Sequence, residues 1–106
     1  MREYTPQQLK IYLETAEPAP LLLDVREAWE YELCCIQGSR HIPMGQIPDE
    51  VKNLDADRET IVICHHGGRS LRVAAFLEGM GFNNVVNLAG GVAAWACEIE
   101  PDLAQY

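Results

Sequence analysis

The residues best suited to chemistry lie in one short segment around Cys64. The segment reads Ile63-Cys64-His65-His66-Gly67-Gly68-Arg69-Ser70. The apolar run of residues 60–63 predicts a buried strand before Cys64, and a pattern with helical periodicity begins at Arg69 or Ser70. Because ligands of open α/β sheets bind at the carboxyl ends of the strands, we expect Cys64 to be exposed in a crevice.

The surroundings of this cysteine suit a sulfur atom that carries negative charge. Gly67 and Gly68 let the loop curl so that its amides face one point, and the next helix directs its N-terminus at the same place. These features stabilise a thiolate. Arg69 adds a planar cationic fork for an anionic substrate, and His65 and His66 could support the charge when protonated. The segment therefore predicts a nucleophile that alternates between a thiolate and a second anionic form, such as a persulfide.

Less specific interpretations exist for each of these residues. A cysteine at a strand end can be a small buried hydrophobe, although the glycines, Arg69 and the helix start favour a reactive thiol at Cys64. The adjacent histidines could be solvated loop residues. Arg72, one helical turn later, fits a solvated helix face better than a site.

The other cysteines give no sign of a metal centre or a disulfide framework. Cys34, Cys35 and Cys97 form no Cys-x-x-Cys spacing with one another or with Cys64, and no His-x-x-x-His pair exists. The N-terminus has charge but no apolar core, so we expect no secretory signal, and disulfides are then not expected. We predict no metal and no cofactor, and a structural role for Cys97.

Composition narrows the function classes further. The 106 residues carry a net charge of −8, with 48% hydrophobic and 23% charged residues, as in an ordinary soluble globular chain. We therefore expect a single domain over residues 1–106 in the cytoplasm. The lysines and arginines are scattered, so no basic patch predicts binding to nucleic acid or to an acidic membrane surface. A small anionic substrate remains compatible with this charge, because local dipoles and arginines can dominate one pocket.

Strand and helix patterns alternate along the chain. The capping pattern of Thr5, Pro6 and Gln8 predicts a helix that ends before Pro18. The predicted strands are 21–25, 60–63 and 85–88, and further helical segments are 27–33, 49–54, 69–80 and a last one from Val92 to Trp95; residues 37–48 are predicted as loop. This alternation favours an α/β fold with a mainly parallel sheet.

Four blocks, in this order and spacing, resemble the rhodanese family. The blocks are residues 22–27, 36–44, 61–70 and 87–95. The resemblance covers nearly the whole chain and implies a central parallel five-stranded sheet with helices on both faces. It also implies a persulfide on Cys64, cradled by the loop to Arg69, with Asp24 and Arg26 as structural supports. Gly90, Gly91 and Trp95 match a packing motif of the family.

The resemblance implies a sulfurtransferase that moves sulfane sulfur from thiosulfate or a similar small anionic donor to cyanide, a thiol or a protein acceptor. One alternative is a persulfide carrier without enzymatic activity, or a module that docks a partner. Phosphatases and arsenate reductases use a related site, but theirs resemble Cys, five residues and then Arg, whereas four residues separate Cys64 from Arg69. Cys35 could resolve a persulfide or disulfide at Cys64, or it could be inert packing.

Overall fold

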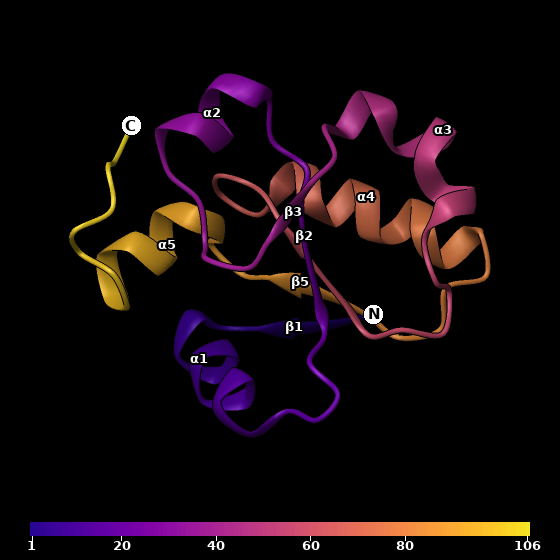
Figure 1. Ribbon diagram of the computed structural model, residues 1–106, viewed down its shortest axis with the longest axis horizontal. Coiled ribbons are helices and arrows are strands. Elements are labelled where there is room, and N and C mark those ends of the chain that lie inside the picture. The colour runs from indigo at the N-terminus through magenta and orange to yellow at the C-terminus, as the bar shows by residue number, and fades with distance from the viewer.

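The computed structural model, which describes residues 1–106, is built on one parallel five-stranded sheet with helices on both faces (Figure 1). The strand order is β1-β5-β4-β2-β3, and every neighbouring pair is parallel. The strands are β1 (Arg2–Tyr4), β2 (Leu21–Asp24), β3 (Arg40–His41), β4 (Thr60–Ile63) and β5 (Val85–Leu88). The helices are α1 (Pro6–Thr15), α2 (Ala28–Leu33), α3 (Ile47–Glu50), α4 (Gly68–Gly79) and α5 (Gly91–Glu98), with short 3-10 segments at Met44–Gln46 and Val51–Asn53. The predicted fold class is confirmed.

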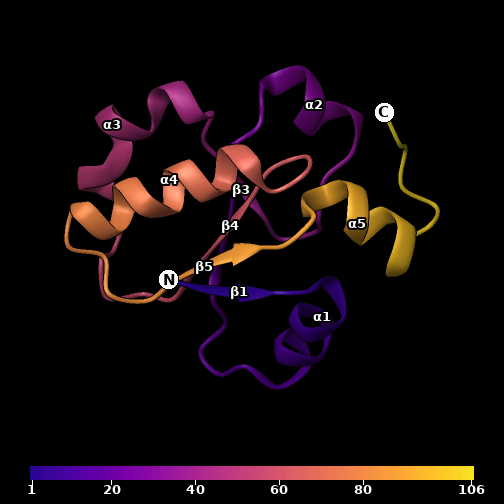
Figure 2. The same ribbon diagram turned by 180° about the vertical axis from the view of Figure 1, so that it is seen from behind.

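The central strands are apolar on both sides, as a sheet covered on both faces requires. Every residue of β4 and β5 is buried. Side chains alternate between the two faces, so Val62 and Cys64 join one apolar cluster, while Ile61 and Ile63 join the other. The first cluster lies under α3 and α4, and the second lies under α1 and α5 (Figure 2).

Local signals explain where the helices begin. Thr5 accepts a hydrogen bond from the backbone N–H of Gln8, and the Gln8 side chain accepts one from the N–H of Thr5, as the capping box predicts. Gly67, which directly precedes α4, has a φ of +104°, and Gly90, which precedes α5, has a φ of +75°. Both helices therefore start at a sharp reversal of the chain that follows the carboxyl end of a strand.

Two strands and one helix face differ from the prediction. The predicted loop of residues 37–48 contains β3, and the N-terminal residues form β1; both strands are short edge strands, which leave little pattern in a sequence. The predicted helix of residues 27–33 forms as α2, but Trp29 and Leu33, four residues apart, are both exposed, and the buried residue is Glu30. The second predicted short helix starts earlier, at Ile47, whose side chain is buried.

No helix of the chain is both long enough and apolar enough to span a membrane.

Candidate active site

The predicted cysteine lies at the bottom of the turn between β4 and α4. The Cys64 Sγ accepts a hydrogen bond from the backbone N–H of Gly67 at 3.1 Å. Its S–H donates to the Ser70 Oγ at 3.3 Å. When the thiol is ionised, the Ser70 hydroxyl can rotate to donate to the sulfur instead. Two polar groups of the predicted loop therefore converge on one sulfur atom.

The expected exposure of Cys64 is wrong. Only 1% of the residue is accessible, and it belongs to the apolar cluster under α4. The reason is the alternation of the sheet, because Cys64 continues the face of Val62 beyond the last residue of β4. A donor therefore reaches Sγ only when groups at the mouth of the loop move aside.

Backbone atoms fasten the Cys64 loop to the start of α5. The Cys64 carbonyl accepts a hydrogen bond from Val92 N–H at 2.8 Å, and the His65 carbonyl accepts one from Ala93 N–H at 2.9 Å. Gly91 permits this approach, because a Cβ there would lie 2.3 Å from the Cys64 carbonyl oxygen, and its φ is +60°. The resemblance matched Gly91 to a packing motif, and in the structure this packing brings α5 directly against the reactive loop.

The Ser70 hydroxyl belongs to a chain of polar groups that crosses the sheet. It lies 3.1 Å from the Gly67 carbonyl oxygen and also donates to Asn87 Oδ1. Asn87 Nδ2 in turn donates to the Glu3 carboxylate at 3.0 Å, which links the loop to β1. Ser70 is fully buried and Asn87 nearly so, so these bonds fix the hydroxyl beside the sulfur.

The Arg69 guanidinium is engaged by a carboxylate of the chain itself. Its Nη1 and Nη2 donate to the two oxygens of Glu30 at 2.7 and 2.8 Å. Glu30 also accepts hydrogen bonds from the backbone N–H of Glu27 at 3.0 Å and from the Tyr106 hydroxyl at 2.7 Å. The hydrogen bonds from Arg69, ahead of the other donors, lower the pKa of Glu30 to about 2. The fork that we expected to meet a substrate therefore already holds an ionised partner.

The segment after α5 places Tyr106 over the same corner. Both ribbon views show the C-terminus of the chain close to α2 (Figures 1 and 2). The Tyr106 ring stacks on His65, with the ring centroids 3.9 Å apart, and meets Trp29 edge-on at 5.5 Å. Burial raises the pKa of Tyr106 to about 12, and its hydrogen bond to Glu30 acts in the same direction. The phenol thus remains a donor to Glu30 at any ordinary pH.

The two histidines of the loop have different surroundings. His65 is half-buried beneath Tyr106, whereas His66 is exposed. Burial lowers the pKa of His65, and the neighbouring His66 lowers it further. This disfavours the protonated form of His65 that we considered as a support for a charged sulfur.

Asp24 and Arg26 form a buried ion pair beside the loop. Arg26 Nη2 lies 2.7 Å from Asp24 Oδ2, and neither side chain is accessible. The same guanidinium donates to the Cys34 carbonyl at 2.7 Å and to the Tyr106 hydroxyl at 2.9 Å. Burial lowers the pKa of Arg26, but its hydrogen bonds to Asp24 and Tyr106 outweigh that effect and raise it overall. The pair fits the supporting role that the sequence suggested.

The remaining cysteines make no contact with the Cys64 sulfur, although Cys34 lies against Arg26, whose Nη1 is 3.9 Å from the Cys34 Sγ. All four thiols are free, and neither Cys34 nor Cys35 makes a hydrogen bond to Cys64. Cys34 is buried, Cys35 is half-buried, and Cys97 is exposed on α5. The structural role expected for Cys97 does not fit an exposed side chain.

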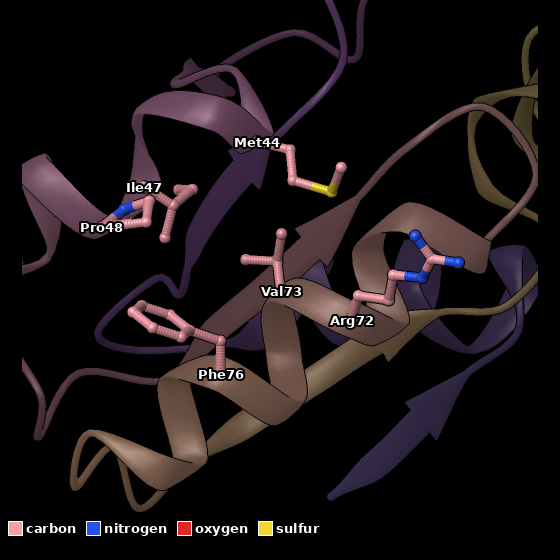
Figure 3. A pocket seen from close by; sticks show the side chains of 6 residues that line it. All are labelled: Met44, Ile47, Pro48, Arg72, Val73 and Phe76. Carbon is pink, nitrogen blue, oxygen red and sulfur yellow. The ribbon is translucent and has the colours of Figure 1, made fainter.

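An apolar groove runs along α4 beyond the loop. It has a volume of about 190 Å³, with Arg72 at the end opposite Pro48 (Figure 3). The lining residues are Met44, Ile47, Pro48, Arg72, Val73 and Phe76. Arg72 forms no hydrogen bond or ion pair and borders this groove, whereas Arg69 faces Glu30. The structure thus gives the two arginines different surroundings.

The structure brings all the predicted loop residues together, from Cys64 to Ser70. It adds Glu30, Asn87 and Tyr106, which sequence reasoning missed. Glu30 alone had a local signal, because it stands three residues after Glu27 in the capping position of α2. The contacts of Asn87 and Tyr106 join residues far apart in the chain, so no local pattern could reveal them.

Comparisons with known proteins agree with this geometry. A family model described as the rhodanese-like domain matches residues 5–98. YtwF of Bacillus subtilis, which bears the name of a sulfurtransferase, is 39% identical over 101 residues, covering 95% of this chain and 96% of that protein. The thiosulfate sulfurtransferase GlpE of Ectopseudomonas mendocina is 33% identical over 104 residues, covering 98% and 93%. The crystal structure of a rhodanese-related protein from Thermoplasma volcanium matches with a TM-score of 0.84 at 33% identity, covering 95% and 96%. The chain spans only 34% of the rhodanese-like/PpiC domain-containing protein 12 of Arabidopsis thaliana, to which it is 32% identical.

Proposed function

We propose that this chain, which belongs to the rhodanese-like domain family, is a sulfurtransferase that carries sulfane sulfur as a persulfide on Cys64. The observation that carries the proposal is the convergence of the Gly67 N–H and the Ser70 hydroxyl on one sulfur atom. We also propose that residues 1–106 act as a single domain in this reaction.

The reaction proceeds in two displacements. In the first, the Cys64 thiolate attacks the outer sulfur of a donor such as thiosulfate, the new S–S bond forms at Sγ, and sulfite leaves with the electron pair of the broken bond. In the second, cyanide, a thiol or a protein thiolate attacks the terminal sulfur and releases the Cys64 thiolate. No oxidant, metal or cofactor takes part, and this is covalent catalysis of the ping-pong type.

The loop residues have distinct roles in this proposal. Gly67 N–H and Ser70 Oγ stabilise the anionic sulfur in both states, since hydrogen bonds to charged groups are the stronger kind. The start of α4 adds its dipole to the same position. His65, His66, Gly68 and Arg69 form the rest of the substrate-binding loop.

Phosphate-ester hydrolysis has less support. The loop has four residues between Cys64 and Arg69, and the arginine that would bind a phosphate oxygen is held by both oxygens of Glu30. A carrier that loads sulfur but does not turn over remains a second candidate, because the geometry around Sγ suits it equally well.

Intact-mass measurement tests the proposal. The protein is incubated with thiosulfate and, separately, with a small organic persulfide, and then with cyanide. We expect the gain of one sulfur on Cys64, its removal by cyanide, and no gain in Cys64→Ser, while Cys97→Ser behaves as the unmodified chain. Absence of any sulfur adduct with both donors would refute the proposal, and loading without turnover in the presence of cyanide or thiols would favour the carrier.

A further inference from the structure

One arginine close to the reactive loop has no partner within the chain. Arg26 and Arg69 each form an ion pair with a carboxylate, whereas Arg72 is exposed and forms none. None of the residues three or four positions from Arg72 along α4 is acidic, so its own helix offers no carboxylate within reach. Arg72 therefore brings an uncompensated positive charge to the surface one helical turn beyond Arg69.

The apolar groove along α4 approaches the reactive loop at this arginine. Helical spacing places Arg69, Arg72 and Val73 on one face of α4, and Arg72 lies roughly 6 Å along the helix axis from Gly68, at 1.5 Å per residue. Val73 lines the groove and also belongs to the apolar cluster that contains Cys64. The floor of the groove is thus the outer side of the cluster in which the reactive sulfur is buried.

The charge along the groove is uneven. Arg72 stands at one end, opposite Pro48, and the other side chains that line the groove are apolar (Figure 3). Asp49 and Glu50 of α3 directly follow Pro48 and do not line the groove. A negative group of a ligand is therefore favoured at the Arg72 end and disfavoured at the Pro48 end.

The size of the groove and the charge of the chain narrow the class of ligand. The volume of about 190 Å³ is below the roughly 300–1,000 Å³ of sites for drug-sized ligands, so the groove accommodates a short alkyl chain. The net charge of −8 opposes the approach of an acidic protein much more strongly than that of a small ion with one negative charge. These features fit a small molecule with one anionic group and a short apolar part.

We propose that this groove is a subsite for the sulfur acceptor, and that the acceptor is a small thiol whose single anionic group binds Arg72 and whose short apolar chain lies against Val73 and Phe76. The inference rests on the proposed function of Cys64. The acceptor thiol loses its proton to solvent, and its thiolate attacks the terminal sulfur of the Cys64 persulfide. A new S–S bond forms on the acceptor, the Sγ–S bond breaks, Cys64 leaves as a thiolate, and the acceptor departs as a persulfide.

The test uses three acceptors that separate charge from chain length. 2-Mercaptohexanoate has a carboxylate and a butyl chain, 2-mercaptohexanamide keeps the chain without the charge, and 2-mercaptopropionate keeps the charge with only a methyl group. Cys64 is first loaded with sulfur, the excess donor is removed, and the discharge of the persulfide is followed by intact mass over a range of acceptor concentrations. Each variant is compared with the unmodified chain for the same acceptor, so the intrinsic reactivity of the thiol cancels.

Two variants change the groove, and two serve as matched controls. Arg72→Gln removes the charge, and Phe76→Ala removes part of the apolar wall. Lys52→Gln removes an exposed charge outside the groove, and Met80→Ala removes an exposed apolar side chain at the end of α4.

We expect Arg72→Gln to lower the second-order rate of discharge by about two- to fivefold for both carboxylates, the range of an exposed ion pair, and to leave the rate with the amide unchanged. Phe76→Ala should lower the rate by about threefold or more for both acceptors with a butyl chain and leave the rate with 2-mercaptopropionate unchanged. Lys52→Gln and Met80→Ala should behave as the unmodified chain with all three acceptors.

The inference and the proposed function fail in different ways. Equal losses with 2-mercaptohexanoate and its amide in Arg72→Gln, or equal losses with all three acceptors in Phe76→Ala, would overturn the acceptor subsite. Unchanged rates in both variants, with circular dichroism showing folded proteins, would overturn it as well and leave the proposed function intact. Failure of Cys64 to take up sulfur from any donor would instead refute the proposed function, and this inference with it.

Discussion

Replacing Gly91 by alanine should disturb the Cys64 loop from a residue that lies outside it. The Cβ of alanine would lie 2.3 Å from the Cys64 carbonyl oxygen and 2.5 Å from that of His65. Both are backbone atoms, which cannot rotate away as the end of a side chain can. The loop or the start of α5 must therefore move, and the hydrogen bonds from Val92 and Ala93 must lengthen.

The size of the effect follows from two contributions. A left-handed backbone costs a residue other than glycine about 1–2 kcal/mol, and the φ of +60° at Gly91 incurs this cost. In addition, the carbonyl must retreat by roughly 1.1 Å to reach ordinary van der Waals contact at 3.4 Å, and errors of about an ångström cost on the order of a hundredfold in rate. We expect the rate of persulfide formation on Cys64 to fall by about ten- to a hundredfold.

A second glycine separates the two contributions. Gly81 has a φ of +95°, but a Cβ there meets nothing within 4 Å. Gly81→Ala should therefore lower the melting temperature, by about 4–8 °C per kcal/mol in a chain of this size, while persulfide formation stays close to that of the unmodified protein. Equal loading rates for Gly91→Ala and Gly81→Ala would refute the reasoning that Gly91 positions the reactive loop.

Four further substitutions test other parts of the site. Cys64→Ala should abolish persulfide formation in the intact-mass assay and, because the side chain is buried, lower the free energy of unfolding by about 1 kcal/mol in a urea titration; sulfur retained elsewhere would contradict this. Glu30→Gln should lower the free energy of unfolding at pH 7 by about 3 kcal/mol, because the pKa of Glu30 is about 2 in the fold against an ordinary 4.5. This stabilisation is present above pH 4.5 and is lost as the pH falls toward 2. If the urea midpoint falls by the same amount between pH 7 and pH 3 in the unmodified protein and in Glu30→Gln, the result would count against the ion pair. Ser70→Ala leaves Sγ with the Gly67 N–H alone, so the persulfide should form about ten- to a hundredfold more slowly, and an unaffected loading rate would show that the hydroxyl is only structural. Cys35→Ser should retain sulfur transfer within about twofold in a thiosulfate–cyanide assay, since Cys35 makes no hydrogen bond to Cys64. Activity that is lost and then restored by an added thiol would reveal a resolving cysteine.

The sequence predicted the parts of the fold that have a contiguous signal. The runs that become β2, β4 and β5 are apolar because both faces of the sheet are covered, and α1 begins at a complete capping box. β1 and β3 went unnoticed because three and two residues at the edges of a sheet carry no period that can be counted. In α2, the spacing of apolar residues does not indicate the buried face. Trp29 is exposed, whereas Glu30 is buried and forms an ion pair with Arg69.

The same distinction applies to the candidate site. The loop from Cys64 to Ser70 was predictable because the residues that suggest its chemistry are consecutive in the sequence. The partner of Arg69 was not, because Glu30 lies 39 residues away in sequence and meets it only through the packing of α2 beside the loop. The burial of Cys64 followed from strand alternation, which outweighed the general expectation that a residue at a strand end is exposed.

The tether between the Cys64 loop and α5 consists of backbone atoms alone. Two carbonyls of the loop meet two N–H groups of the helix, and Gly91 contributes only the absence of a side chain. The side chain of the exposed His66 makes no hydrogen bond and only its ring contacts the ring of His65, so a new residue there would leave the backbone tether in place. Position 66 is therefore a place where this architecture can acquire new donor or acceptor preferences in a single step, and a saturation library at that codon should return mostly folded proteins that differ in selectivity.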